Sequence, residues 1–294
     1  MKNKDQIVAT FSIVGFDPKT KELGIAVQSK FLGVGAVVPW AKAGVGAIAT
    51  QSFANTSYGP KGLDLMASGK SAQETLDLLV SDDEERGSRQ AGIVDANGNA
   101  ATFTGDDCYD WAGGFAGPNV AVQGNILVNE KTVEMMVETF NNSEGELSER
   151  LLTALDAGQN AGGDSRGKQS AALLVVKEKG GYAGFNDRYI DLRVDDHPEP
   201  IKELIRLHKL QQLYFSKTKA NHILEIKGKI KEELTSLLSK LNYLSSKEVS
   251  DVQLNQAFKT FIHTENFEER DLGNGKIDKE VLEFMKSKVG QLKN

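Results

Sequence analysis

Glycine is distributed unevenly along this chain of 294 residues and divides it into two regions. Twenty-five of the 29 glycines, and both tryptophans, precede residue 205, where short β-type runs alternate with turns. Glycine tolerates the positive φ values of tight turns, so this density is typical of a sheet with many hairpins. From Pro200 onward, apolar residues recur every three or four positions, which predicts helices. We therefore expect a domain at 1–200, a helical linker at 201–221 and a small helical domain at 222–294.

Three hairpins are predicted in the first region. Residues 7–16 and 23–29 flank an Asp-Pro turn, and Asn97-Gly98 lies between strand-like flanks, which is the strongest short hairpin signal. The third hairpin is expected from residues 171–177 and 182–185. The apolar runs 34–38 and 45–51 predict two further strands.

Helices interrupt these strands in blocks. Ser71 and Glu74 form a capping-box pattern, and helices are also expected at 132–140 and 147–157. Hairpins separated by blocks of helix indicate an α+β fold with antiparallel sheets, and not the strand–helix alternation of a doubly wound parallel sheet.

The last region carries three apolar stripes at helical spacing. The first includes Ile226, Leu234 and Leu238, the second ends at Phe261, and Asp278 is the predicted N-cap of the third. Three short helices of this kind can form a small bundle.

Charge and composition narrow the classes of function. The net charge is −6, and residues 1–204 hold 19 basic against 29 acidic residues, which argues against a nucleic-acid-binding main domain. No apolar run reaches the roughly 18 residues of a membrane span, and the first residues carry no apolar signal segment. A single cysteine, Cys108, excludes an internal disulfide framework. We expect a cytoplasmic protein with no membrane partner.

Several longer motifs carry a resemblance to a known family. They are Thr10–Val14, Gly24–Phe31, Val45–Ala54, Val122–Asn125, Ala161–Ala171 and Asn186–Pro198. In this order they closely resemble the bacterial DUF1028 family, which is assigned to the Ntn-hydrolase superfamily. The resemblance covers roughly residues 9–200 and implies an αββα sandwich. The tail, through Leu241–Tyr243, Glu265–Arg270 and Gly275–Asp278, resembles a peptidoglycan-binding domain family, which implies a cell-wall fragment as partner.

The superfamily resemblance implies catalysis by an N-terminal threonine, which here is Thr10. Its hydroxyl would attack a carbonyl, and its α-amine, with a reference pKa of about 7.7–8.0, would accept the proton. Nine residues precede Thr10 in this sequence. Either the chain is cleaved after Ala9, or the true start differs, or the amine mechanism does not operate. Ser12, on the same face of the strand, is the alternative nucleophile.

Further site residues follow from the same resemblance. Lys30 would lower the proton affinity of the nucleophile, Asn125 would donate to the oxyanion, and Asp164 with Ser165 would hold the terminal ammonium. The residues expected to bind substrate are Ser12, Ser29, Gln51, Ser52, Gln123, Ser165 and Arg166.

No metal or cofactor is expected. The sequence Asp195-Asp196-His197 precedes a proline-rich linker, and the tail histidines have no partner at metal-ligand spacing. The glycine pairs near residues 33 and 44 lack the helix that opens a nucleotide-binding fingerprint.

Two functions of different class remain open. The first is hydrolysis of an amide bond in a small substrate through Thr10. The second is a non-catalytic protein that keeps the fold and binds a glycan or a protein through its helical tail. Self-association through the tail, giving a homo-oligomer, is a third option.

Overall fold

The computed structural model describes residues 10–245 and 249–292. They form two compact units, one ending at Leu207 and the other beginning at His208. The division falls within helix α5 (Pro200–Phe215). Among the described residues, no helix is both long and apolar enough to cross a membrane.

A six-stranded antiparallel sheet forms the centre of the first unit, with the order β10-β9-β2-β1-β8-β7. Its strands are β1 (Thr10–Phe16), β2 (Leu23–Ser29), β7 (Gly113–Gly117), β8 (Val120–Asn125), β9 (Ser170–Val176) and β10 (Arg188–Val194). β1 is an inner strand and pairs with β2 on one side and β8 on the other. Its first residue therefore has a neighbour on each side.

A four-stranded antiparallel sheet, in the order β3-β4-β5-β6, stacks on the first. Its strands are β3 (Pro39–Lys42), β4 (Gly46–Ser52), β5 (Arg89–Asp95) and β6 (Ala100–Thr104). Apolar side chains from β1, β2, β4, β8 and β9 fill much of the space between the sheets.

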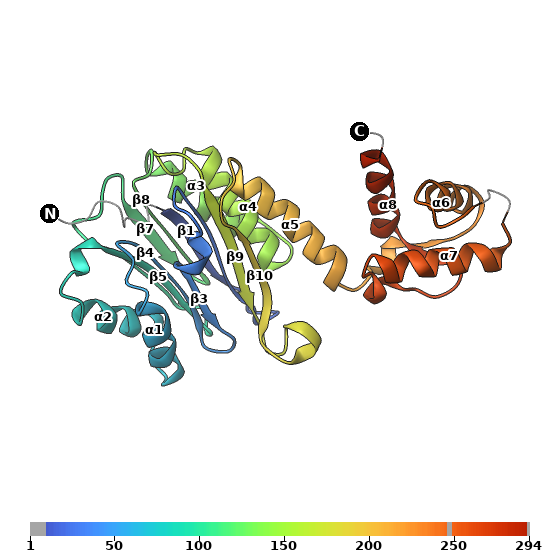
Figure 1. Cartoon of the computed structure of the whole chain (residues 1–294). Coiled ribbons are helices and arrows are strands. Elements are labelled where there is room, and N and C mark those ends of the chain that lie inside the picture. Colours follow the sequence, from blue (N-terminus) through green and yellow to red (C-terminus); the bar gives the residue numbers. More distant parts are fainter. Residues whose placement is uncertain (1–9, 246–248, 293–294) are drawn as a thin grey trace. The chain divides into compact units, whose positions relative to one another are not determined.

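Helices cover the two outer faces of the stacked sheets (Figure 1). α3 (Lys131–Asn142) and α4 (Leu147–Asn160) pack on the six-stranded sheet through Met136, Phe140 and Leu151. α1 (Tyr58–Ala67) and α2 (Ala72–Ser81) pack on the four-stranded sheet through Met66 and Leu76. The unit is therefore a mixed α/β fold of four layers, with helices outside and antiparallel sheets inside.

Most of the predicted elements of this unit are confirmed. β1 and β2 form the first hairpin, with residues 7–9 of the expected strand outside the described residues, and β5 and β6 flank Asn97-Gly98. Ser71 caps α2 in a capping box with Glu74. The helices expected at 132–140 and 147–157 are α3 and α4.

Two local predictions were wrong. The partner of β9 is β10, at 188–194, because residues 182–184 form a 3₁₀ turn within the connection. Residues 34–36 form a 3₁₀ helix and not a strand, and Gly33 before them has a left-handed φ of 68°. Val34 and Val38 are buried, and a short apolar run does not by itself distinguish a buried strand from a buried turn.

The second unit is helical, as predicted, with one addition. α6 (Gly228–Lys240), α7 (Asp251–Thr264) and α8 (Lys279–Gln291) enclose a core that includes Leu234, Phe261 and Met285. Asp278 caps α8, accepting a hydrogen bond from the backbone N–H of Glu280. A small antiparallel pair, β11 (Ile223–Glu225) and β12 (Lys276–Asp278), was not predicted, because three residues are too few to show an alternating pattern.

Candidate functional site

Polar side chains gather at one end of the space between the two sheets. Successive residues of a strand point to opposite faces, so alternate residues of β1 face this space. Val14 and Phe16 make it apolar toward the end of β1. Its other end is polar, and the residues there are fully buried: Thr10, Ser12, Ser29, Gln51, Gln90, Gln123 and Asn125.

Thr10 is the first residue of β1 and lies between two strands. Its register partners are Ser29 on β2 and Asn125 on β8. The Thr10 hydroxyl donates to Ser29 Oγ at 3.1 Å, and Gln51 Nε2 donates to the Thr10 carbonyl at 3.3 Å. Three predicted site residues therefore surround Thr10.

Ser12 lies at the centre of a hydrogen-bond chain between the sheets. Its hydroxyl donates to Gln51 Oε1 at 2.6 Å and accepts from Gln123 Nε2 at 2.6 Å. The hydroxyl proton is thus engaged by an amide oxygen that cannot act as a strong base. This arrangement makes Ser12 a weaker candidate for the nucleophile than Thr10.

Gln90, which the sequence analysis did not single out, connects these residues. Its Oε1 accepts from Gln51 Nε2 at 2.8 Å and from Asn125 Nδ2 at 2.9 Å. Its Nε2 donates to the Gly124 carbonyl at 2.7 Å and to Thr104 Oγ1 at 2.9 Å. A glutamine in an otherwise apolar run of β5 was the available sequence signal, since a buried amide needs partners.

Lys30 is placed differently from the expectation. Its side chain is exposed, and its Nζ lies 3.5 Å from the Lys168 carbonyl, whereas Thr10 is fully buried. Lys30 follows the last residue of β2, and its ammonium remains in water. A hydrated charge acts weakly on a buried hydroxyl, because solvent screens it.

Asp164 fixes the turn that follows α4. Its buried carboxylate accepts from the Lys30 backbone N–H at 3.0 Å and from Arg166 Nη2 at 3.1 Å. Arg166 and Ser165 are exposed, and the Ser165 backbone N–H donates to the Ile126 carbonyl. The carboxylate expected to hold a terminal ammonium is therefore already bonded to these two residues.

Ser52 ends β4 at the edge of this region, with a positive φ of 67°. It is buried and hydrogen-bonds with the thiol of Cys108. Burial raises the pKa of Cys108 above its ordinary value and so disfavours the thiolate, which is the reactive form.

Arg89 anchors the loops next to Gln90 and Gln51. It pairs with Asp83 through Nε at 2.9 Å and donates from Nη1 to the Phe53 carbonyl at 2.8 Å. Burial raises the pKa of Asp83, but hydrogen bonds from Arg89, Asn55, Tyr58 and a backbone N–H outweigh burial and hold this pKa well below its usual value. Burial, together with the adjacent Asp83, raises the pKa of Tyr58.

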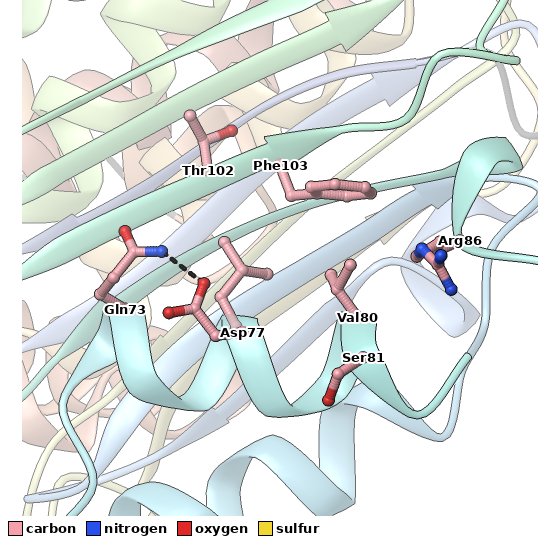
Figure 2. Close-up of a pocket in the computed structure, with 8 residues that line it drawn as sticks. Gln73, Asp77, Val80, Ser81, Arg86, Thr102 and Phe103 are labelled. Atoms are coloured by element: carbon pink, nitrogen blue, oxygen red, sulfur yellow. Dashed lines mark hydrogen bonds between the residues drawn. The ribbon is translucent and has the colours of Figure 1, made fainter. Parts of the chain in front are cut away.

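Two cavities lie beside α1 and α2, and Thr10 lines neither. One, of about 530 Å³, is lined by Asn55, Tyr58 and Asp83 among others. The other, of about 470 Å³, lies between α2 and β6. Figure 2 shows Gln73 and Asp77 at one end of it, joined by a hydrogen bond of 2.8 Å, and Arg86 at the other.

One group of potential metal ligands occurs in the described part of the second unit. His222, Asp278 and Glu280 bring ligand atoms within 4.8 Å of one another. Arg270, however, pairs with both acids, through Nη1 to Asp278 at 2.6 Å and Nη2 to Glu280 at 3.3 Å. The guanidinium already neutralises the negative charge with which the two acids would attract a metal cation.

The fold and site together define a mixed α/β protein whose two antiparallel sheets enclose a buried polar cluster, followed by a small helical unit. The chain belongs to the DUF1028 family, described as a "Family of unknown function", whose model matches residues 10–204. A second model, described as "Putative peptidoglycan binding domain", matches residues 214–285.

A solved structure of a DUF1028 protein agrees with the family match. The crystal structure of protein SPO2555 from Silicibacter pomeroyi, a DUF1028 protein, is 32% identical with a TM-score of 0.64, over 69% of this chain and 89% of that one. Anbu (ancestral beta-subunit) from Yersinia bercovieri gives 10% identity and a TM-score of 0.32, over 68% of this chain and 94% of that one. The Anbu similarity is too low to carry an argument. The comparison with curated proteins gave no match.

Proposed function

We propose that the first unit is an N-terminal-nucleophile hydrolase that cleaves an amide bond with Thr10. The observation that carries this proposal is the position of Thr10: it begins β1 between Ser29 and Asn125, at the polar end of the space between two antiparallel sheets. Thr10 also lies within the sequence motifs whose resemblance to the DUF1028 family implied an Ntn-type αββα sandwich. No cofactor is required by this chemistry.

The reaction would proceed in two balanced steps. Thr10 Oγ attacks the carbonyl carbon of the substrate while its proton passes to the α-amine, and that proton then leaves with the departing amine as the C–N bond breaks. Water hydrolyses the resulting ester, with the amine again accepting a proton. Asn125 has a second N–H besides the one donated to Gln90, and that N–H is our candidate donor to the oxyanion.

The proposal requires that Thr10 become the first residue, because its nitrogen is an amide while residues precede it. We expect an intact-mass measurement of purified protein to show loss of residues 1–9, and turnover of model amides only in material that has lost them. Thr10→Ala should abolish both the loss of residues 1–9 and the turnover of model amides. Full activity in an uncleaved protein, or in Thr10→Ala, would refute the mechanism.

A second candidate function concerns the second unit. The match of residues 214–285 to a separate family model supports a binding role for this unit, with a cell-wall glycan as its partner. We expect the full chain to sediment with insoluble peptidoglycan, and to do so equally after Thr10→Ala. An uncleaved, inactive protein that binds peptidoglycan in this way would favour the non-catalytic function over hydrolysis.

A further inference from the structure

Two fully buried amide oxygens of β8 lack a hydrogen-bond donor among residues 10–245 and 249–292. They are Gln123 Oε1 and Asn125 Oδ1. Gln123 Oε1 packs against Gly92 of the opposite sheet, where the missing side chain leaves room for it. Asn125 Oδ1, on the strand residue next to Thr10, has no comparable explanation. A buried carbonyl oxygen without a donor is unfavourable, by roughly 1–3 kcal/mol, so it points to a ligand that carries N–H groups.

The orientation of the Asn125 amide follows from its partners. Gln90 Nε2 lies 2.7 Å from the Gly124 carbonyl, and a carbonyl can only accept. Gln90 must therefore present Oε1 to Gln51 and Asn125, and both must present their nitrogen atoms to it. Turning the Asn125 amide over would place its oxygen against Gln90 Oε1. Gln90 thus forces Asn125 Oδ1 to remain available for another donor.

We infer that Asn125 Oδ1 accepts a hydrogen bond from the α-ammonium of Thr10 once that residue is the N-terminus. This inference rests on the proposed function. Thr10 and Asn125 are register partners, and Cβ atoms of such pairs are roughly 4.5–5.5 Å apart. An ammonium at Thr10 supplies the N–H groups that Asn125 Oδ1 lacks. Asn125 is then a positioning residue for the base, and Gln90 a positioning residue for Asn125.

Other acceptors near Thr10 are less suited to this role. Its neighbours on β2, β4 and β8 include the neutral side chains of Ser29, Gln51 and Asn125. Gln90 of β5, also neutral, bonds to Gln51 and Asn125. Among the charged groups at this edge, Asp164 is bonded to Lys30 N and Arg166, and the Lys30 ammonium is exposed. A neutral acceptor stabilises the ammonium and raises the pKa of the amine, while leaving it able to act as a base near neutral pH.

The test measures the Thr10 amine directly. Matured protein is treated with cyanate across a pH series, and carbamylation of the N-terminal peptide is followed by mass spectrometry, because only the unprotonated amine reacts. Asn125→Leu should lower the midpoint of this profile by roughly one pH unit, since a hydrogen bond to the ammonium is lost. If the leucine variant does not fold, Asn125→Ala can replace it, because the smaller side chain cannot clash with its neighbours. The same lowering of the midpoint is expected for Asn125→Ala.

Gln123→Leu is the matched control. It removes a buried amide from the same strand and face and breaks the contact with Ser12, but leaves Asn125 Oδ1 in place. The midpoint should stay within about 0.3 pH unit of the parent protein's. Equal midpoints in the parent and both Asn125 variants would overturn the inference while leaving the proposed function intact. Absence of a free Thr10 amine in every sample would overturn both.

Discussion

Gly92 of β5 lies directly opposite Gln123 of β8 across the two sheets: a Cβ at position 92 would be 1.8 Å from Gln123 Oε1. No real side chain tolerates that distance, so the glycine makes room for the amide that binds Ser12. The packing of the sheets and the hydrogen-bond network thus depend on one another.

Gly92→Ala should destabilise the protein by roughly 1–3 kcal/mol, because the added methyl group forces the Gln123 side chain or the sheets to move. Chemical denaturation provides the measurement. The same substitution in a Gln123→Ala background should cost much less, since the atom that clashes is gone. Additive effects in this double-mutant cycle would show that the two residues do not interact.

Ser12→Ala tests whether Ser12 serves only as a member of the buried hydrogen-bond network or is the nucleophile. It leaves Gln51 Oε1 and Gln123 Nε2 without their shared partner, so we expect a loss of roughly 1–3 kcal/mol in unfolding free energy. Loss of residues 1–9, measured by intact mass, should still occur, unlike in Thr10→Ala. Ser12→Ala protein that folds but is never processed would make Ser12 the better nucleophile.

Lys30→Met should change little. Because the ammonium is exposed and hydrated, we expect the free energy of unfolding to change by less than about 0.5 kcal/mol and turnover by less than about threefold. Denaturation and steady-state rates measure the two effects. A hundredfold loss of turnover with unchanged stability would restore the electrostatic role expected from the resemblance.

The Asp83–Arg89 pair predicts acid sensitivity of the first unit. Because the pKa of folded Asp83 lies below the unfolded value of about 3.9, its contribution to stability is fully present above that value. The contribution starts to decline as the pH falls below about 4 and is gone below the folded pKa. Asp83→Asn should therefore be less stable than the parent at pH 7, and lose less stability between pH 5 and pH 3. Urea midpoints at the three pH values provide the comparison. Asp64→Asn, at an exposed position, should follow the parent.

Arg270→Met should destabilise the second unit by roughly 3–5 kcal/mol, because it leaves buried Asp278 without its cation and the carbonyls of Gln212 and Leu213 without their donor. Hydrogen exchange of the α8 amides would locate the effect. Lys286→Met removes a half-exposed partner of Glu233 and Glu283 in the same unit and should cost at most about 1 kcal/mol. Equal effects of the two substitutions would contradict the special role of Arg270.

Local patterns in the sequence determined much of this protein. Glycine density separated sheet from helix, Asn97-Gly98 located the β5–β6 turn, and Ser71 and Asp278 marked the starts of two helices. These features depend on residues a few positions apart, so a short window of sequence contains the whole signal. The alternation along β1 likewise placed Thr10 and Ser12 on one face.

Only the tertiary structure determined which side chains of the candidate site contact one another. Gln90 meets Asn125, and Gly92 meets Gln123, only because one sheet stacks on the other. No local pattern records which residues of two sheets will face each other. The same holds for Lys30, whose ammonium lies outside the sheets, and for Asp164, whose carboxylate bonds to the Lys30 backbone N–H 134 positions earlier. Contacts of this range are set by the packing of whole layers, and a side chain's partners become definite only when those layers come together.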